Sequence, residues 1–211
     1  RAVDDEIDED GDHPPLQPNT TPHISRIEHT TSSADPFYNR NEPDLRPVVT
    51  VSITDNDTAQ LLLTMSSLTI TEGQTGSYSI RLATPPRAPV TVRTEEQSDG
   101  LLSLSPRTLT FDASNWSEPQ LVTVLVADDD VDTIYPTERI THTVTSADPA
   151  YDALATSSVV VRVIDNDVAA ILLSTSTLTI TEGLSTTYTV RLATQPTRPV
   201  TLALAATGPI T

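Results

Sequence analysis

An internal repeat with a spacing of 110 residues constrains the fold of this chain more than any other feature. Residues 68–73 have the sequence LTITEG, and the same sequence returns at 178–183. Asp-Asn-Asp at 55–57 returns at 165–167 with the same offset. A constant offset means that neither copy carries an insertion. The repeat is long enough to form one domain, so the fold of one copy determines the architecture of the chain.

A second set of matches relates the start of the chain to its middle. The acidic run at 4–8 resembles 128–132, an offset of 124, and Ser-Ala-Asp-Pro at 33–36 returns at 146–149, an offset of 113. The difference indicates a Pro-rich insert near 11–22, which cannot form a central strand. We interpret the chain as an excerpt of a longer array in three parts. These are the C-terminal part of a first repeat (1–57, with the insert), a complete repeat (58–167), and the N-terminal part of a third (168–211).

Alternation of apolar residues predicts seven strands in the complete repeat, separated by Gly, Pro and Asp turns. The predicted strands are 60–70, 77–83, 89–94, 101–111, 120–127, 139–146 and 158–164. The many β-branched residues favour strands over helices. Seven short strands in 110 residues are typical of an immunoglobulin-like sandwich, with a closed barrel as the alternative. The predicted fold class is therefore all-β, as tandem seven-stranded sandwiches, with Trp116 covering one end of the core.

The composition argues against several classes of function. The formal net charge is −17, and nucleic-acid phosphates need a basic surface. Cys is absent, which excludes disulfides and thiol catalysis. The chain has no run of 18 apolar residues, so we expect no membrane insertion in this segment. The four His form no metalloprotease pairing, and neither a nucleophile elbow nor a Gly-rich phosphate loop is present. We therefore expect no enzymatic activity.

Carboxylates follow the ends of the odd-numbered strands. Consecutive antiparallel strands alternate in direction, so the first, third, fifth and seventh strands end at the same pole. The acids just beyond those ends are Glu72; Glu95, Glu96 and Asp99; Asp128, Asp129, Asp130 and Asp132; Asp165 and Asp167. Such a set repels itself unless a cation compensates, and Ca²⁺ binds six to eight oxygens from flexible loops. The alternatives are solvated Asp-rich turns, or a break at Pro106 that moves the last two clusters to the opposite pole.

The order of these motifs resembles the Calx-beta repeat. Glu-Gly follows the first predicted strand, Asp-Asp-Asp the fifth and Asp-Asn-Asp the last, and the phrases LTFDASNW and VIDND are similar to those of bacterial and algal surface proteins. The resemblance implies a seven-stranded sandwich that binds Ca²⁺ through these loops. The ligand candidates that it implies are Glu72, Asp128, Asp129, Asp130, Asp165 and Asp167, with Asp4, Asp5, Asp55 and Asp57 in the first repeat and Glu182 in the third. The chain departs from the family in lacking its mid-domain Gly-x-Asp-Tyr segment.

Three Asn-x-Ser/Thr sequons are candidate glycosylation sites, at Asn19, Asn56 and Asn115. Asn19 lies in the Pro-rich insert and is the best acceptor, because that segment is expected to be exposed. Asn115 lies in a predicted loop. Asn56 lies between two candidate ligands, so a glycan there would compete with the ion.

These features predict a structural spacer or assembly segment of an extracellular filament or cell-surface glycoprotein, with junctions between repeats that Ca²⁺ stiffens. The resemblance suggests an algal mastigoneme-type protein of the ciliary surface or a bacterial adhesin-type protein. The expected partners are neighbouring repeats of the same long chain and other copies or filament subunits. The alternatives are an adhesin module that binds carbohydrate or protein and, less favoured, an intracellular calcium-sensing Calx-beta domain.

Overall fold

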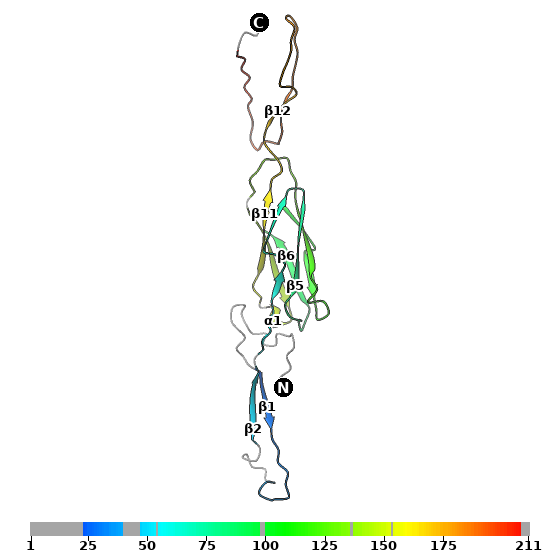
Figure 1. Cartoon of the computed structure of the whole chain (residues 1–211), viewed down its shortest axis with the longest axis vertical. Helices are drawn as coiled ribbons and strands as arrows, with labels where there is room; N and C mark the ends of the chain where they lie inside the picture. Colours follow the sequence, from blue (N-terminus) through cyan, green and yellow to red (C-terminus); the bar gives the residue numbers. More distant parts are fainter. Residues whose placement is uncertain are drawn as a thin grey trace.

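The computed structural model describes residues 23–39, 47–53, 55–97, 100–135, 137–152 and 154–207. The molecule is elongated, with a β-hairpin at one end, two packed sheets in the middle and a third segment at the other end (Figure 1). Of the sequence candidates, Asp4, Asp5, Asn19 and Asp99 lie outside the described residues. Within the described part, no helix is both long and apolar enough to cross a bilayer.

Two sheets form the central sandwich, which confirms the predicted all-β fold class. The larger sheet has the order β4 (Ser67–Thr71), β11 (Ser157–Ile164), β10 (Glu138–Ser146), β6 (Val90–Glu96) and β8 (Thr108–Phe111). The smaller has the order β3 (Leu61–Leu63), β5 (Thr75–Leu82), β9 (Gln120–Val126) and β7 (Leu102–Ser105). A single helical turn, α1 (Pro149–Asp152), follows β10. All neighbouring strands are antiparallel except β4 and β11.

Two of the predicted strands each divide between the two sheets. The first becomes β3, which pairs with β5, and β4, which pairs with β11. The fourth becomes β7, which pairs with β9, and β8, which pairs with β6. Pro106 lies at this second break, where the missing N–H interrupts a ladder. The chain keeps its direction as it passes from β7 in one sheet to β8 in the other. The expectation that a break at Pro106 moves the later acids to the opposite pole is therefore wrong.

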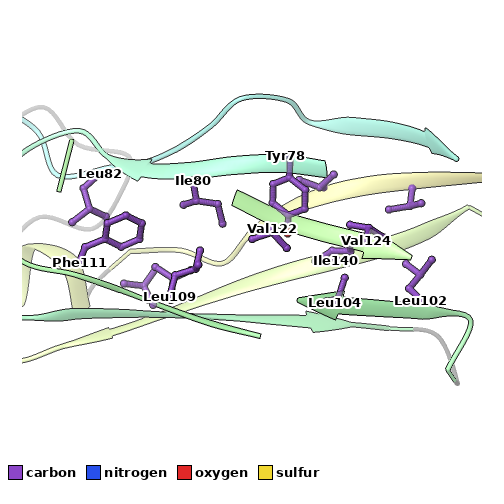
Figure 2. Close-up of a cluster of buried hydrophobic side chains, with 14 of the residues drawn as sticks. Tyr78, Ile80, Leu82, Leu102, Leu104, Leu109, Phe111, Val122, Val124 and Ile140 are labelled. Atoms are coloured by element: carbon purple, nitrogen blue, oxygen red, sulfur yellow. The ribbon is translucent and has the colours of Figure 1, made fainter. Parts of the chain in front are cut away.

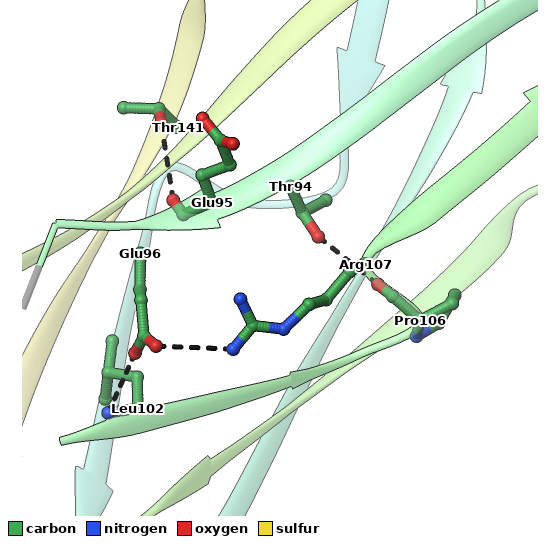
Figure 3. Close-up of polar contacts among 7 residues, drawn as sticks. All are labelled: Thr94, Glu95, Glu96, Leu102, Pro106, Arg107 and Thr141. Atoms are coloured by element: carbon green, nitrogen blue, oxygen red, sulfur yellow. Dashed lines mark hydrogen bonds and ion pairs between the residues drawn. The ribbon is translucent and has the colours of Figure 1, made fainter. Parts of the chain in front are cut away.

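The crossing at Pro106 is fixed by side chains of β6 (Figure 3). Thr94 Oγ1 donates to the Pro106 carbonyl at 3.2 Å. Glu96 accepts from the Leu102 N–H at 3.1 Å and pairs with Arg107 at 3.3 Å. Glu96 was expected among the acids of the cation-binding pole. Its contacts instead hold the start of β7 and the start of β8 against β6.

The core is built from the inward-facing residue of each alternating pair, and it is mostly aliphatic (Figure 2). Tyr78, Phe111 and Tyr151 are its largest fully buried side chains. Trp116 packs against this core but is only partly buried, and its carbonyl accepts from the Leu82 N–H at 2.9 Å. Trp116 therefore caps one end of the core, as expected, without being part of its centre.

The pole opposite the acids is closed by hydrogen bonds from α1. The Tyr151 hydroxyl donates to the Thr84 carbonyl at 2.6 Å and accepts from the Thr84 N–H at 3.2 Å. Asp148 Oδ2 accepts from the Arg87 N–H at 2.8 Å. These bonds satisfy backbone groups of the loop after β5, and those of the buried Thr84 would otherwise cost stability.

The terminal segments reproduce local pairings of the central sandwich. The β12 (Ile171–Leu173) and β13 (Val190–Leu192) strands pair with Ile171 opposite Leu192, as β3 and β5 pair with Leu61 opposite Leu82. The β1 (His23–Glu28) and β2 (Val48–Ile53) strands pair with Ile27 opposite Val49, as β10 and β11 pair with Ile140 opposite Val159. Each register is the one that the sequence offset predicts.

A histidine of β10 is buried inside the sandwich. His142 is 0% exposed and its ring meets that of Tyr78 edge-on, with centroids 5.5 Å apart. Its Nε2 lies 2.7 Å from the Tyr78 hydroxyl, and its Nδ1 lies 3.3 Å from the Ser157 carbonyl. A neutral ring satisfies both, with Nδ1–H as donor and Nε2 as acceptor. Burial lowers the pKa of His142, because it penalises the charged ring.

We expect this histidine to make the central sandwich sensitive to acid. Its folded-state pKa lies below that of the unfolded chain, so the unfolded state binds more protons and stability falls as the pH drops below about 6.5. Urea unfolding measured between about pH 5 and pH 8 should show a shallower loss of stability for His142→Gln than for the unchanged chain. His29→Gln, at an exposed site, is the control. An equal loss in all three proteins would contradict the prediction.

Candidate metal centre

Three carboxylates converge at the pole where β4 and β11 end. Glu72 directly follows β4, and Asp165 and Asp167 follow β11. One oxygen from each of the three lies within 4.8 Å of the others. Because β4 and β11 are parallel neighbours, their C-terminal ends lie side by side, and the turns that follow them bring the three side chains together.

Backbone bonds and a glycine position Glu72 and its neighbour. The Glu72 N–H donates to the Ile164 carbonyl at 3.0 Å, and the Gly73 N–H donates to the Val126 carbonyl at 3.2 Å. Gly73 has a φ of 70°, in the left-handed region that glycine adopts without strain. A Cβ at this position would lie 3.2 Å from the Asp128 carboxyl group. Glycine therefore permits both the turn and the close approach of the Asp128 loop.

Asp165 is the fixed anion of the cluster. Its Oδ1 accepts from the Asp167 N–H at 2.7 Å, and its Oδ2 accepts from the Thr133 N–H. These donors stabilise the charged carboxylate and lower the pKa of Asp165. Next to it, the Asn166 side-chain amide donates to Asp128 Oδ1 at 3.1 Å. The turn after β11 is thereby bonded to the loop that follows β9.

Glu72 and Asp167 each have a carboxylate oxygen with no hydrogen-bond partner in the described structure. Glu72 is 1% exposed; its Oε1 accepts from the Tyr135 hydroxyl at 2.6 Å, and its Oε2 has no partner. Burial raises the pKa of Glu72, and the nearby Asp129 and Asp165 charges raise it further. Burial likewise raises the pKa of Asp167, whose Oδ2 also lacks a partner. Buried anionic oxygens without donors are costly unless a cation or a proton neutralises them.

The donor set fits a hard divalent cation. It offers only oxygens, it is anionic, and two unpartnered oxygens belong to the cluster itself. Ca²⁺ accepts six to eight such oxygens in flexible geometry, whereas Mg²⁺ retains more of its water. Glu72, Asp165 and Asp167 would hold the ion, and the neighbouring Asp128 and Asp129 lie on the loop after β9.

The remaining candidates of the central repeat do not join this cluster. Asp129 Oδ1 accepts from the Val131 N–H at 2.7 Å, and its Oδ2 lies 3.4 Å from the Tyr135 hydroxyl. Asp130 is exposed, and its carbonyl oxygen accepts from the Gln195 N–H at 2.7 Å. Asp129 therefore lies at the edge of the cluster, whereas the carbonyl of Asp130 contacts the next segment.

Tyr135 is the site residue that the sequence interpretation missed. Its hydroxyl contacts Glu72 and Asp129, and these anions and burial raise its pKa, so it stays a donor. The available signal was that Tyr135 is the one aromatic residue in the acidic loop 127–135.

The candidates of the flanking segments show only part of this arrangement. Asp55 Oδ1 accepts from the Asp57 N–H at 2.9 Å, the same turn that Asp165 and Asp167 form. Glu182 follows Thr181 as Glu72 follows Thr71, but it is exposed and lies in the segment at the opposite end of the molecule (Figure 1). The structure does not bring Glu182 together with Asp55 and Asp57 within one chain.

The two sequons in the described part differ in their surroundings. Asn56 is exposed between Asp55 and Asp57. Asn115 is partly buried; its side chain accepts from the Asp112 N–H at 2.7 Å and donates to the Thr110 carbonyl at 3.3 Å. Asn115 is thus already bonded within its loop, and Asn56 is the more accessible of the two.

Comparison with known proteins identifies no family for this chain. No family model and no curated protein matches the chain. Similar solved structures include the apo form of the Calx CBD1 domain, at 16% identity and a TM-score of 0.36, covering 53% of this chain and 100% of that one. SSP-19, an MSP-domain protein of Caenorhabditis elegans, has 12% identity and a TM-score of 0.35, with 48% and 96% covered. The class 5 fimbriae chaperone CfaA has 12% identity and a TM-score of 0.35, with 55% and 60% covered.

Proposed function

We propose that this chain is a structural spacer segment of an extracellular filament or cell-surface glycoprotein, and that Ca²⁺ stiffens the junctions between its repeats. The observation that carries the proposal is the position of the carboxylate cluster. Glu72, Asp165 and Asp167 lie where the central sandwich continues into 168–207. An ion bound there acts on the junction between two repeats.

One loop contacts both sides of this junction. Residues 127–135 follow β9, and the Thr133 N–H donates to Asp165 in the cluster. From the same loop, Asp132 Oδ2 accepts from the Ala169 N–H at 2.7 Å, and the Asp130 carbonyl accepts from the Gln195 N–H at 2.7 Å. Ordering the loop around a cation would therefore also order its bonds to the next segment.

The electrostatics support a cation in this role. Without one, the clustered carboxylates repel one another, and this repulsion contributes to the raised pKa values of Glu72 and Asp167. A site assembled from side chains of two turns suits the weaker Ca²⁺ affinities of extracellular modules, with dissociation constants on the order of 0.1–1 mM. An extracellular location, and a mastigoneme-type assembly in particular, is proposed on the sequence resemblance.

The test is X-ray scattering of the chain at low concentration, with Ca²⁺ and with chelator. We expect Ca²⁺ to narrow the distribution of angles between the central sandwich and 168–207, which changes the maximum dimension. Asp128→Asn, Asp129→Asn and Asp165→Asn together should abolish the change, and Mg²⁺ at equal ionic strength is the matched control. Identical scattering in Ca²⁺ and in chelator would leave a passive, metal-free spacer.

A further inference from the structure

Tyr135 places a hydroxyl group among the carboxylates of the candidate metal centre. Its oxygen lies 2.6 Å from Glu72 Oε1 and 3.4 Å from Asp129 Oδ2. A hydroxyl has one proton, and the shorter distance shows that Glu72 receives it. Oε2 of Glu72 has no partner in the described structure. Tyr135 therefore supplies the side-chain donor for a carboxylate that is otherwise unsatisfied.

The aromatic ring holds this hydroxyl in position. Tyr135 is partly buried and packs against the hydrophobic core of the central sandwich. Two residues earlier in the same loop, the Thr133 N–H donates to Asp165 of the cluster. The packed ring and the neighbouring backbone bond both restrict the loop, so the hydroxyl is a fixed part of the site.

The hydroxyl proton and a bound cation would compete for the negative charge of Glu72. A hydrogen bond to a charged carboxylate is stronger than a bond between neutral groups, and losing one changes an equilibrium constant about tenfold. While Tyr135 donates to Oε1, that oxygen is a weak ligand for a cation. Oε2 is then the oxygen of Glu72 that remains to bind an ion.

Coordination through one Glu oxygen suits a different ion from coordination through two. Ca²⁺ accepts six to eight oxygens and often takes both oxygens of one carboxylate, whereas Mg²⁺ demands near-octahedral geometry and keeps several waters. A Glu72 that offers Oε2 alone meets the demand of Mg²⁺ better than that of Ca²⁺. The Tyr135 hydroxyl thus affects the choice of ion as well as the affinity.

We propose that Tyr135 is a specificity-determining residue of the candidate metal centre. Its hydroxyl takes the place of a cation beside Glu72 in the ion-free chain, and it restricts Glu72 to one ligand oxygen when an ion binds. The site is thereby weaker for Ca²⁺, and less selective against Mg²⁺, than its carboxylates alone would make it. This assignment rests on the proposed calcium function, because it concerns the same site.

Tyr135→Phe isolates the contribution of the hydroxyl. The Phe ring retains the packing against the core, so the variant should fold. Neither oxygen of Glu72 then has a side-chain donor, and in chelator the melting temperature should lie about 5 °C or more below that of the unchanged chain. This measurement involves no metal, and an unchanged melting temperature would overturn the assignment.

Melting at a series of Ca²⁺ and Mg²⁺ concentrations tests the specificity. An ion that binds only the folded state raises the melting temperature with its concentration, which gives its dissociation constant. In Tyr135→Phe both oxygens of Glu72 are free to coordinate. The dissociation constant for Ca²⁺ should fall about tenfold, and that for Mg²⁺ should change by less than about threefold. A merely structural role of Tyr135 would not shift the ratio of the two constants.

Two further variants control the measurement. Tyr38→Phe removes the hydroxyl of an exposed tyrosine outside the central sandwich, and it should leave the melting temperature in chelator and both dissociation constants unchanged. In a Glu72→Gln background, Tyr135→Phe should not improve Ca²⁺ binding, because the hydroxyl then has no Glu72 charge to engage.

The results separate this assignment from the calcium function itself. Equal changes in the two dissociation constants, or weaker Ca²⁺ binding by Tyr135→Phe, would show that the hydroxyl positions Glu72 for any ion. Either result would overturn the assignment and leave the calcium function intact. A response to Ca²⁺ in Tyr135→Phe alone would support the assignment and contradict calcium binding by the unchanged chain. A response in neither protein would overturn both.

Discussion

Replacing Phe111 by Ala is expected to lower the free energy of unfolding of the central sandwich by about 3–5 kcal/mol, as for other large buried aromatic residues. Phe111 is 0% exposed at the end of β8 and belongs to the buried hydrophobic cluster drawn in Figure 2. The surrounding strands are paired on both sides of the core, so the cavity cannot collapse fully. A loss of this size is a large fraction of the stability of an ordinary domain.

Urea unfolding followed by circular dichroism measures this loss, and Trp116→Ala is the comparison. Trp116 is the larger side chain but is only partly buried, so its truncation should cost clearly less than that of Phe111. A larger loss for Trp116→Ala than for Phe111→Ala would show that the partly buried Trp116 contributes more to the stability of the core than the buried Phe111 does. Because the central strands form one cooperative unit, a single transition is expected in each protein.

Strand direction was the part of the fold that the sequence predicted well. Alternating apolar residues give the order of the strands, and antiparallel order then places Glu72, Asp165 and Asp167 at one pole. The two crossings between sheets were not predicted, because a strand that changes sheets keeps the same inward-outward alternation. Only the pairing partner changes, and pairing is not encoded in the pattern of one strand.

The chemistry of the individual acids was predicted less well than their location. Repeat spacing and turn composition do not distinguish a carboxylate that faces the cluster from one that bonds elsewhere. Glu96 is bonded to the start of β7, and the Asp130 carbonyl bonds to the next segment. Tyr135 was missed because its role depends on the fold of the loop after β9. The limits of the three predicted repeats and the calcium ligands stay predictions.

The carboxylate cluster should also make the central sandwich less stable without a cation and more stable with one. Because the pKa of Glu72 is raised in the folded state, the folded chain binds this proton more tightly than the unfolded chain does. The contribution of this protonation to the free energy of unfolding is fully present below the unfolded pKa of about 4.3, and it is lost as the pH rises through the folded value. At neutral pH and in chelator, Glu72→Gln should therefore raise the melting temperature. A Gln retains an oxygen for the Tyr135 hydroxyl and adds a donor toward the neighbouring carboxylates.

Calcium should reverse the order of the melting temperatures, so that the unchanged chain melts above Glu72→Gln. An ion that binds only the folded state stabilises it by about 2.7 kcal/mol at a concentration 100 times its dissociation constant, which corresponds to about 10 °C or more for a domain of this size. The unchanged chain should show this rise, and Glu72→Gln should lose most of it, because the ion then lacks its buried ligand. Glu118→Gln, an exposed residue between β8 and β9, is the charge-matched control and should behave as the unchanged chain does in both buffers. If Glu72→Gln melted lower than the unchanged chain in chelator and still responded fully to Ca²⁺, Glu72 would be a structural residue, and the candidate metal centre would lose the ligand on which its geometry depends.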